Sequence, residues 1–186
     1  MFDPKKESTI VQKAFQIASK VHEKQLRRNT NAPYIEHPLA VMEIAEKISR
    51  ILYNDADIKH FKTFLDEIKI VAILHDTVED AEENYKKGKL LKKDIIRMKD
   101  IEKKFGKDIK KYVDNLTKKD GEEYDEAIER ASMDIVSLIV KIADNTHNAS
   151  TLRQNDPIEK HKRRTYLISR RYLLSKIGLT PEDLGE

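Results

Sequence analysis

The chain of 186 residues carries 36 Lys or Arg against 33 Asp or Glu, which gives a formal net charge of +3, and it contains no cysteine. The missing cysteine excludes a disulfide framework, a thiolate zinc site and a cysteine nucleophile. No apolar stretch approaches the roughly 20 residues of a membrane span, and residues 1–10 lack the apolar core of a secretory signal. We therefore expect a cytoplasmic protein without a membrane partner, and the small net charge gives no reason to expect nucleic acid as one.

The first half of the chain shows helical periodicity. With only five Gly and five Pro, the composition favours an all-α fold in a single domain, residues 1–186. Apolar residues recur at helical spacing over residues 10–21, and the polar residues 27–33 then indicate a loop. A second helix is expected to begin at His37-Pro38, because proline in the first turn of a helix leaves no hydrogen bond unmade. A third helix is expected over residues 61–74.

The second half continues the same pattern. A Lys-rich segment, residues 85–104, has an apolar side and is expected to expose a basic helix face to solvent. Shorter and longer helices are expected over residues 109–116 and 127–143. The last helix should begin at Asp156-Pro157 and stop at Gly178. No period-2 alternation indicates a strand.

Polar residues able to bind a metal interrupt or border three apolar segments. His37 lies at the expected start of the second helix, and the apolar residues 71–74 run directly into His75 and Asp76, with Glu79 and Asp80 close behind. Buried unpaired charge is costly, so these residues need a reason to be there. In a continuous helix the two carboxylates would lie four residues after His75 and Asp76, on the same surface.

The third segment is residues 140–148. Asp144, Asn148 and Thr151 fall at i, i+4 and i+7, so they face one way on a helix. Each of the three places has an ordinary explanation as a cap, a helix end or a solvated surface. Together, two histidines and two carboxylates would form an N₂O₂ ligand set, which suits Mn, Fe, Co or Zn.

The order of His37, His75-Asp76 and Asp144 resembles the H…HD…D pattern of HD-domain metal-dependent phosphohydrolases. The flanking residues resemble the hydrolase domain of RelA/SpoT enzymes, and the short length resembles the stand-alone small alarmone hydrolases. His22, Gln25 and Arg28 are matched to the H-x-x-Q-x-R run that lies upstream in that family. The matching motifs are PYIEHPLAV at residues 33–41, LHDTVED at 74–80, FG at 105–106, VDNLTK at 113–118 and VKIADNTHN at 140–148.

The resemblance implies a single helical HD bundle and a specific chemistry. It implies one Mn²⁺ ion, held by His37, His75, Asp76 and Asp144. It assigns catalysis to an acidic pair, Glu79 and Asp80, without saying which is base and which is acid. It assigns nucleotide binding to Arg28, Asn148 and Thr151.

The implied reaction is that of a guanosine-3′,5′-bis(diphosphate) 3′-pyrophosphohydrolase. The enzyme removes the 3′-pyrophosphate of (p)ppGpp and leaves GDP or GTP, so the partner is a small guanine nucleotide. With roughly 30 residues after the last motif, we expect no synthetase segment. Homo-oligomerisation stays open.

Departures from the family pattern leave the identity of the substrate undecided. Asn29, the TNA sequence at residues 30–32, and Asn145 stand where the family often carries other residues, and each would remove phosphate-binding charge or change a loop near the nucleotide. One alternative is another nucleotide with a 2′- or 3′-phosphate, such as NADPH. A second is a pyrophosphorylated RNA 3′ end, with the protein acting as an antitoxin. A third is a non-catalytic alarmone-binding module, against which the intact acidic pair argues.

Two further readings concern residues outside the motifs. The basic residues of 86–104 and 160–171 are expected to be solvated, with a basic lid over the phosphates as the alternative. The remaining histidines are expected not to bind metal. Among them, His147 is the best placed to contact one of the residues that do. These remaining histidines are His22, His60, His147 and His161.

Overall fold

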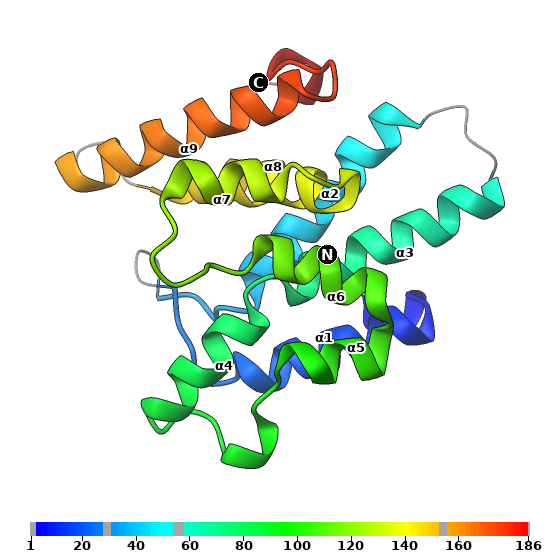
Figure 1. Cartoon of the computed structure of the whole chain (residues 1–186), viewed down its shortest axis with the longest axis vertical. Helices are drawn as coiled ribbons and strands as arrows, with labels where there is room; N and C mark the ends of the chain where they lie inside the picture. Colours follow the sequence, from blue (N-terminus) through cyan, green and yellow to red (C-terminus); the bar gives the residue numbers. More distant parts are fainter. Residues whose placement is uncertain (1–2, 28–30, 54–57, 153–155, 186) are drawn as a thin grey trace.

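The computed structural model describes residues 3–27, 31–53, 58–152 and 156–185, without the side chains of residues 58 and 59. The described chain is helical, as the composition predicted, and its one β-type feature is an isolated bridge between Leu26 and Pro33 (Figure 1). None of the described helices combines the length and apolarity needed to cross a bilayer. The α-helices are α1 Thr9–Val21, α2 Glu36–Leu52, α3 Ile58–Leu74, α4 Thr77–Lys86, α5 Met98–Phe105, α6 Lys107–Leu116, α7 Tyr124–Ala131, α8 Ile135–Thr151 and α9 Pro157–Ser175, with short 3₁₀ turns at Pro4–Lys6, Lys92–Asp94 and Glu182–Leu184.

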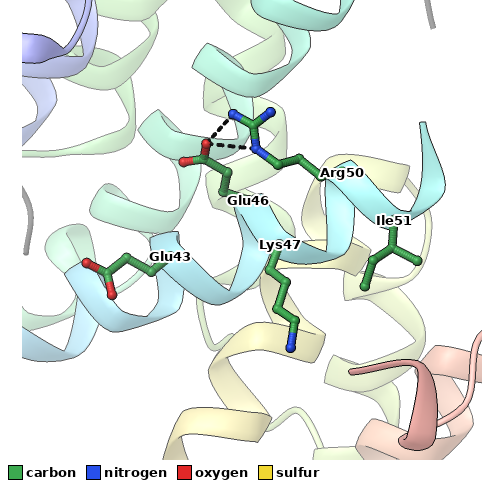
Figure 2. Close-up of a pocket in the computed structure, with 5 residues that line it drawn as sticks. All are labelled: Glu43, Glu46, Lys47, Arg50 and Ile51. Atoms are coloured by element: carbon green, nitrogen blue, oxygen red, sulfur yellow. Dashed lines mark hydrogen bonds and ion pairs between the residues drawn. The ribbon is translucent and has the colours of Figure 1, made fainter. Parts of the chain in front are cut away.

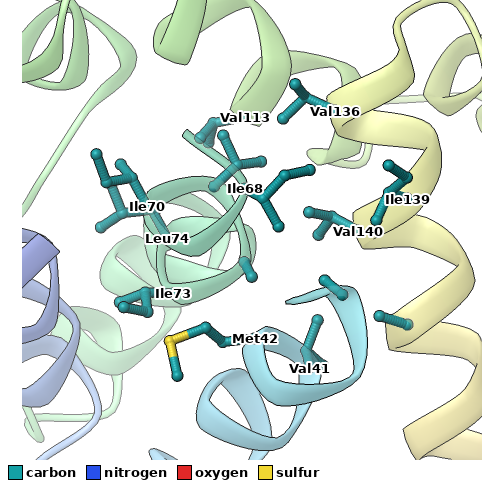
Figure 3. Close-up of a cluster of buried hydrophobic side chains, with 14 of the residues drawn as sticks. Val41, Met42, Ile68, Ile70, Ile73, Leu74, Val113, Val136, Ile139 and Val140 are labelled. Carbon is teal, nitrogen blue, oxygen red and sulfur yellow. The ribbon is translucent and has the colours of Figure 1, made fainter. Parts of the chain in front are cut away.

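Helix α3 lies at the centre of the bundle. It packs against α1, α2, α6 and α8, while α9 covers the outer side of α8 (Figure 1). Ile68 of α3 and Val140 of α8 have no exposed surface, and Figure 3 shows their side chains facing each other between the two helices. Burying an aliphatic side chain of this kind contributes about 1.5–3 kcal/mol. The near-continuous apolar runs in α3 and α8 therefore reflect helices that are surrounded by others.

Helix α3 ends where the sequence predicted, and the chain then turns instead of continuing as one helix. Helix α3 ends at Leu74, His75 and Asp76 form a turn, and α4 begins at Thr77. The ring of His75 donates to the backbone carbonyl of Ala72 at 2.8 Å, so the side chain takes an acceptor from the last turn of α3. Because the helix does not continue past Leu74, the four polar residues do not share one helix surface. They reach a common site from a turn and from the first turn of α4.

Two segments that were each expected to form one helix are interrupted by turns. The segment 127–143 is split by residues 132–134 into α7 and α8, and Asp134 at the break accepts from Asn115 Nδ2 at 2.7 Å. The Lys-rich segment 85–104 is not one helix either, because Gly88 adopts a positive φ of 69° and a 3₁₀ turn follows before α5. Its lysines are exposed, as expected, but Ile95 and Ile96 anchor irregular backbone to the core.

Candidate metal centre

Four helical elements bring the predicted metal ligands together. His37 lies in the first turn of α2, His75 and Asp76 in the turn between α3 and α4, and Asp144 in the middle of α8. Ligand atoms of His37, His75 and Asp76 lie within 4.8 Å of one another. Asp144 Oδ1 lies 3.2 Å from His37 Nε2 and 3.8 Å from His75 Nε2. Residues more than 100 positions apart in the sequence therefore meet at one point.

The orientation of His75 is suited to a cation. Its Nδ1–H donates to the carbonyl of Ala72, so the lone pair of the neutral ring is on Nε2. That nitrogen is buried without a hydrogen-bond partner and lies 3.1 Å from Asp76 Oδ2. A lone pair facing carboxylate oxygens is repelled unless a proton or a metal ion lies between them. Burial lowers the pKa of His75, but the charges of Asp76 and Asp144 outweigh it and raise this pKa to about 9 in the metal-free protein.

His147, the histidine that the sequence singled out, holds His37 in place. The Nδ1 atoms of His37 and His147 lie 2.7 Å apart and the two rings are stacked. Burial, followed by the influence of His37 and Arg27, lowers the pKa of His147 to about 4, so its ring is neutral. His147 Nδ1 then accepts the Nδ1–H of His37, which directs His37 Nε2 toward Asp144 and Asp76.

The two carboxylates are anchored by residues around them. Tyr34 donates its hydroxyl to Asp76 Oδ2 at 2.6 Å. Asn148 donates to Asp144 Oδ1 at 2.6 Å, and Lys141 contacts Asp144 Oδ2 at 2.9 Å. Burial raises the pKa of Asp144, but Lys141 and the two histidines hold it well below the usual range, so the carboxylate stays ionised. An oxygen and nitrogen donor set of this kind, with no thiolate, fits a divalent metal ion.

The acidic pair lies beside this cluster, on the first turn of α4. Burial and the neighbouring charge of Asp76 raise the pKa of Asp80 to about 7, against the lowering effect of a hydrogen bond from Gln25 Nε2 at 2.8 Å. Glu79 Oε2 accepts from the backbone N–H of Lys118 at 3.3 Å. A carboxyl group with a pKa near 7 can both accept and donate a proton at neutral pH.

A cavity of about 680 Å³ opens next to the acidic pair. Glu79, Asp80, Asn148 and Thr151 all line it, so the structure brings together most of the predicted catalytic and nucleotide-binding residues. Its rim carries both signs of charge. The basic residues are Arg27, Lys87, Lys89 and Lys162, and the further acidic residues are Glu83, Asp156 and Glu159.

Among the described residues, Arg27 is the arginine that lines this cavity, and the sequence motifs had not singled it out. Its Nη2 lies 3.1 Å from Thr151 Oγ1 and 3.3 Å from Asn148 Oδ1, and its guanidinium lies 5.7 Å from the centre of the Tyr34 ring. Arg28, the residue predicted for this role, lies outside the described residues, as does Asn29. A His-x-x-Gln-x-Arg spacing counted from His22 falls on Arg27, so the signal was present in the sequence.

Two other features lie away from the cavity. Asn145 is fully buried against α9, where its Nδ2 donates to Ser169 Oγ at 2.9 Å. The prediction that Asn145 changes phosphate-binding charge near the nucleotide is therefore wrong. An open hollow of about 630 Å³ on the outer face of α2, shown in Figure 2, contains none of the predicted site residues. It is lined by Glu43, Glu46, Lys47, Arg50 and Ile51.

Comparisons with known proteins agree with this geometry. The family model described as HD domain matches residues 34–149. A probable GTP pyrophosphokinase of Mycobacterium leprae is 33% identical over 172 residues, which are 88% of this chain and 18% of the relative. The bifunctional (p)ppGpp synthase/hydrolase SpoT of Escherichia coli is 29% identical over 82% of this chain and 19% of its own length. The chain thus spans about a fifth of the length of these curated relatives.

A solved structure with the same fold is among the matches. It is described as a metazoan ortholog of SpoT that hydrolyzes ppGpp and plays a role in starvation responses. The match has a TM-score of 0.66 and 23% sequence identity, and it covers 96% of this chain and 90% of the other.

Proposed function

The chain belongs to the HD-domain family and is related over most of its length to (p)ppGpp synthases and hydrolases, and from this premise we propose that it is a metal-dependent 3′-pyrophosphohydrolase of (p)ppGpp. One observation carries the proposal. The buried and unpartnered Nε2 of His75 faces two carboxylates, and an acidic pair and a cavity of nucleotide size lie beside it.

One Mn²⁺ ion is the proposed cofactor, and His37, His75, Asp76 and Asp144 would hold it. When bound, such an ion polarises a phosphoryl oxygen and lowers the pKa of an attacking water. The chain supplies ligands that are already oriented. His147 and Ala72 fix the two imidazole rings from behind, so little ordering remains to be done when the ion binds.

The acidic pair would move the protons. The water oxygen forms a bond to the phosphorus attached to the 3′ oxygen, the bond from that phosphorus to the 3′ oxygen breaks, and pyrophosphate leaves with GDP or GTP as the other product. We assign the proton transfer to Asp80, because its raised pKa lets it take a proton from the water and return one to the 3′ oxygen. Glu79 lines the same cavity, where the backbone of Lys118 holds its carboxylate.

We assign nucleotide binding to Arg27, Asn148 and Thr151, which form one side of the cavity. The guanidinium of Arg27 already lies over the ring of Tyr34, and its flat face can stack on a base or its N–H groups can bind a phosphate. Asn148 contacts both Arg27 and Asp144, so one amide links the nucleotide side of the cavity to the metal ligands.

A substrate panel tests the proposal. Metal-free protein, with Mn²⁺ added back, is offered ppGpp, NADPH and dNTPs in parallel, and the released phosphate or pyrophosphate is measured. We expect pyrophosphate from ppGpp only, and only when Mn²⁺ is present. Turnover of NADPH instead of ppGpp would support the metal-dependent chemistry but contradict (p)ppGpp as the substrate. Tight nucleotide binding without any turnover would contradict the enzymatic function.

A further inference from the structure

Gln25 lies between the proposed proton-transfer group and two buried polar residues. Its side-chain Nε2 donates to Asp80 Oδ2 at 2.8 Å. Its Oε1 accepts from Asn84 Nδ2 at 2.7 Å and lies 2.8 Å from His22 Nδ1. His22 and Asn84 are 1% and 3% exposed, so these contacts are shielded from solvent. The four side chains come from α4 and from the segment that follows α1.

The orientation of the Gln25 amide is set by its neighbours. A primary amide has an acceptor end and a donor end, and its two ends can exchange by rotation. Asn84 Nδ2 also donates to the carbonyl of Val21 at 3.1 Å, which fixes Asn84 with its NH₂ group toward Gln25. A rotated Gln25 would place NH₂ against NH₂ and its oxygen against the Asp80 carboxylate. The N–H of Gln25 is therefore committed to Asp80.

His22 completes the arrangement as a neutral donor. Its Nδ1 is 2.8 Å from the Gln25 oxygen but 3.7 Å from Asp80 Oδ2, beyond hydrogen-bond distance. Burial lowers the pKa of His22, so the ring is uncharged and keeps its Nδ1 proton for Gln25. The Asp80 carboxylate thus receives one neutral N–H at Oδ2, and no group among the described residues donates to Oδ1.

We propose that Gln25 is a positioning residue for Asp80, and that Asn84 and His22 set the orientation of its amide. The inference rests on the proposed function, in which Asp80 transfers the proton. Gln25 would hold Oδ2 and thereby fix the rotation of the carboxylate, which leaves Oδ1 for the reacting water. Misplacement of a catalytic group by about 1 Å costs up to about 100-fold in rate, so the contribution is measurable.

A double-mutant cycle tests whether Gln25 acts through Asp80. Gln25→Met keeps the length of the side chain but removes both hydrogen-bonding ends. We expect kcat for ppGpp to fall about 10- to 100-fold, with KM and Mn²⁺ affinity changed by less than about threefold. In an Asp80→Ala background, Gln25→Met should cause no further loss in single-turnover measurements. A loss of the same factor in both backgrounds would show a merely structural role and overturn the proposal.

Matched variants separate positioning from folding. Gln12→Met removes a comparable side-chain hydrogen bond from α1, the one to the carbonyl of Glu7, and should leave the rate unchanged. If Gln25→Met does not fold, Asn84→Ala removes one of the two groups that orient the amide. It should lower kcat several-fold in the wild-type background and not at all beside Asp80→Ala.

Side-chain NMR of the metal-free protein gives a result that does not depend on turnover. The Gln25 amide protons should exchange slowly with water in the wild type and lose that protection in Asp80→Ala, while Glu79→Ala leaves it intact. Unchanged protection in Asp80→Ala would overturn the proposal even if the wild type hydrolyses no ppGpp. Failure of the substrate panel with normal NMR behaviour would instead contradict only the proposed function.

Discussion

At the scale of single residues, the metal centre depends on which ring nitrogen each histidine presents. The backbone of Ala72 and the ring of His147 take the Nδ1 protons of His75 and His37, and both Nε2 atoms are left facing Asp76 and Asp144. Replacing His75 with alanine removes one of these two Nε2 atoms and leaves His37 as the only histidine of the pair that faces Asp76 and Asp144. We expect His75→Ala to weaken Mn²⁺ binding at least 100-fold by titration calorimetry. His161→Ala, an exposed histidine on α9, is the control and should bind Mn²⁺ normally.

A substitution of Asp80 tests whether this residue transfers the proton without binding the metal. Asp80→Asn keeps the size and the hydrogen-bonding shape of the side chain but cannot accept the proton. We expect Mn²⁺ affinity within about threefold of wild type and a kcat for ppGpp at least 100-fold lower. The exposed Asp125→Asn on α7 should leave both quantities unchanged. A fully active Asp80→Asn protein would refute the role assigned to this carboxylate.

The raised pKa of His75 predicts how metal binding depends on pH. The ring carries its extra proton below a pKa of about 9 in the metal-free protein, and the ion must displace that proton. Mn²⁺ affinity should therefore rise about tenfold per pH unit between pH 6.5 and 8.5 and level off above pH 9. Titrations in buffers of different ionisation enthalpy should show about one proton released per ion at pH 7. Affinity independent of pH would contradict the assignment of that proton.

At the scale of elements, a loop holds the side chain of Glu79, whose backbone lies on α4. The segment between α6 and α7 presents the N–H of Lys118 to Glu79, and Arg130 of α7 holds that segment. Arg130 contacts both carboxylate oxygens of Glu122 at 2.7 and 2.6 Å and donates to the carbonyls of Asp114 and Thr117. The ion pair between Arg130 and Glu122 is largely shielded from solvent, because only 16% and 12% of the two side chains are exposed.

Arg130→Lys should not replace this clamp, because an ammonium group lacks the flat fork that binds both oxygens at once. We expect a loss of about 1–3 kcal/mol in the free energy of unfolding in urea. Arg50→Ala, which breaks an exposed pair with Glu46 on α2, should cost less than about 1 kcal/mol. Equal stability of Arg130→Lys and wild type would show that the fork does not hold the loop.

The sequence predicted the helical class and most helices, because buried stripes repeat at helical spacing regardless of what lies between them. It did not predict the break at residues 132–134, because that break depends on a bond between residues distant in the sequence, Asn115 and Asp134. The four proposed metal ligands could be named from their order in the chain. The contact of Lys141 with Asp144 follows from their i,i+3 spacing on α8, whereas Gln25 meets Asp80 only through folding.

At the scale of the whole molecule, the nearly balanced charge hides an uneven distribution. Ionised carboxylates gather at the junction of α2, α3, α4 and α8, whereas residues 86–104 hold nine basic and three acidic side chains. Lys87 and Lys89 of that segment line the rim of the cavity. A basic lid over incoming phosphates stays a prediction, and so does the solvated alternative.

The central claim is that one divalent ion lies between His75 and the two carboxylates, beside the acidic pair. Anomalous diffraction from crystals loaded with Mn²⁺ tests it most directly. We predict a single strong peak in direct contact with His37 Nε2, His75 Nε2, Asp76 and Asp144. A peak elsewhere, or no peak at a Mn²⁺ concentration that supports full ppGpp hydrolysis, would contradict the account.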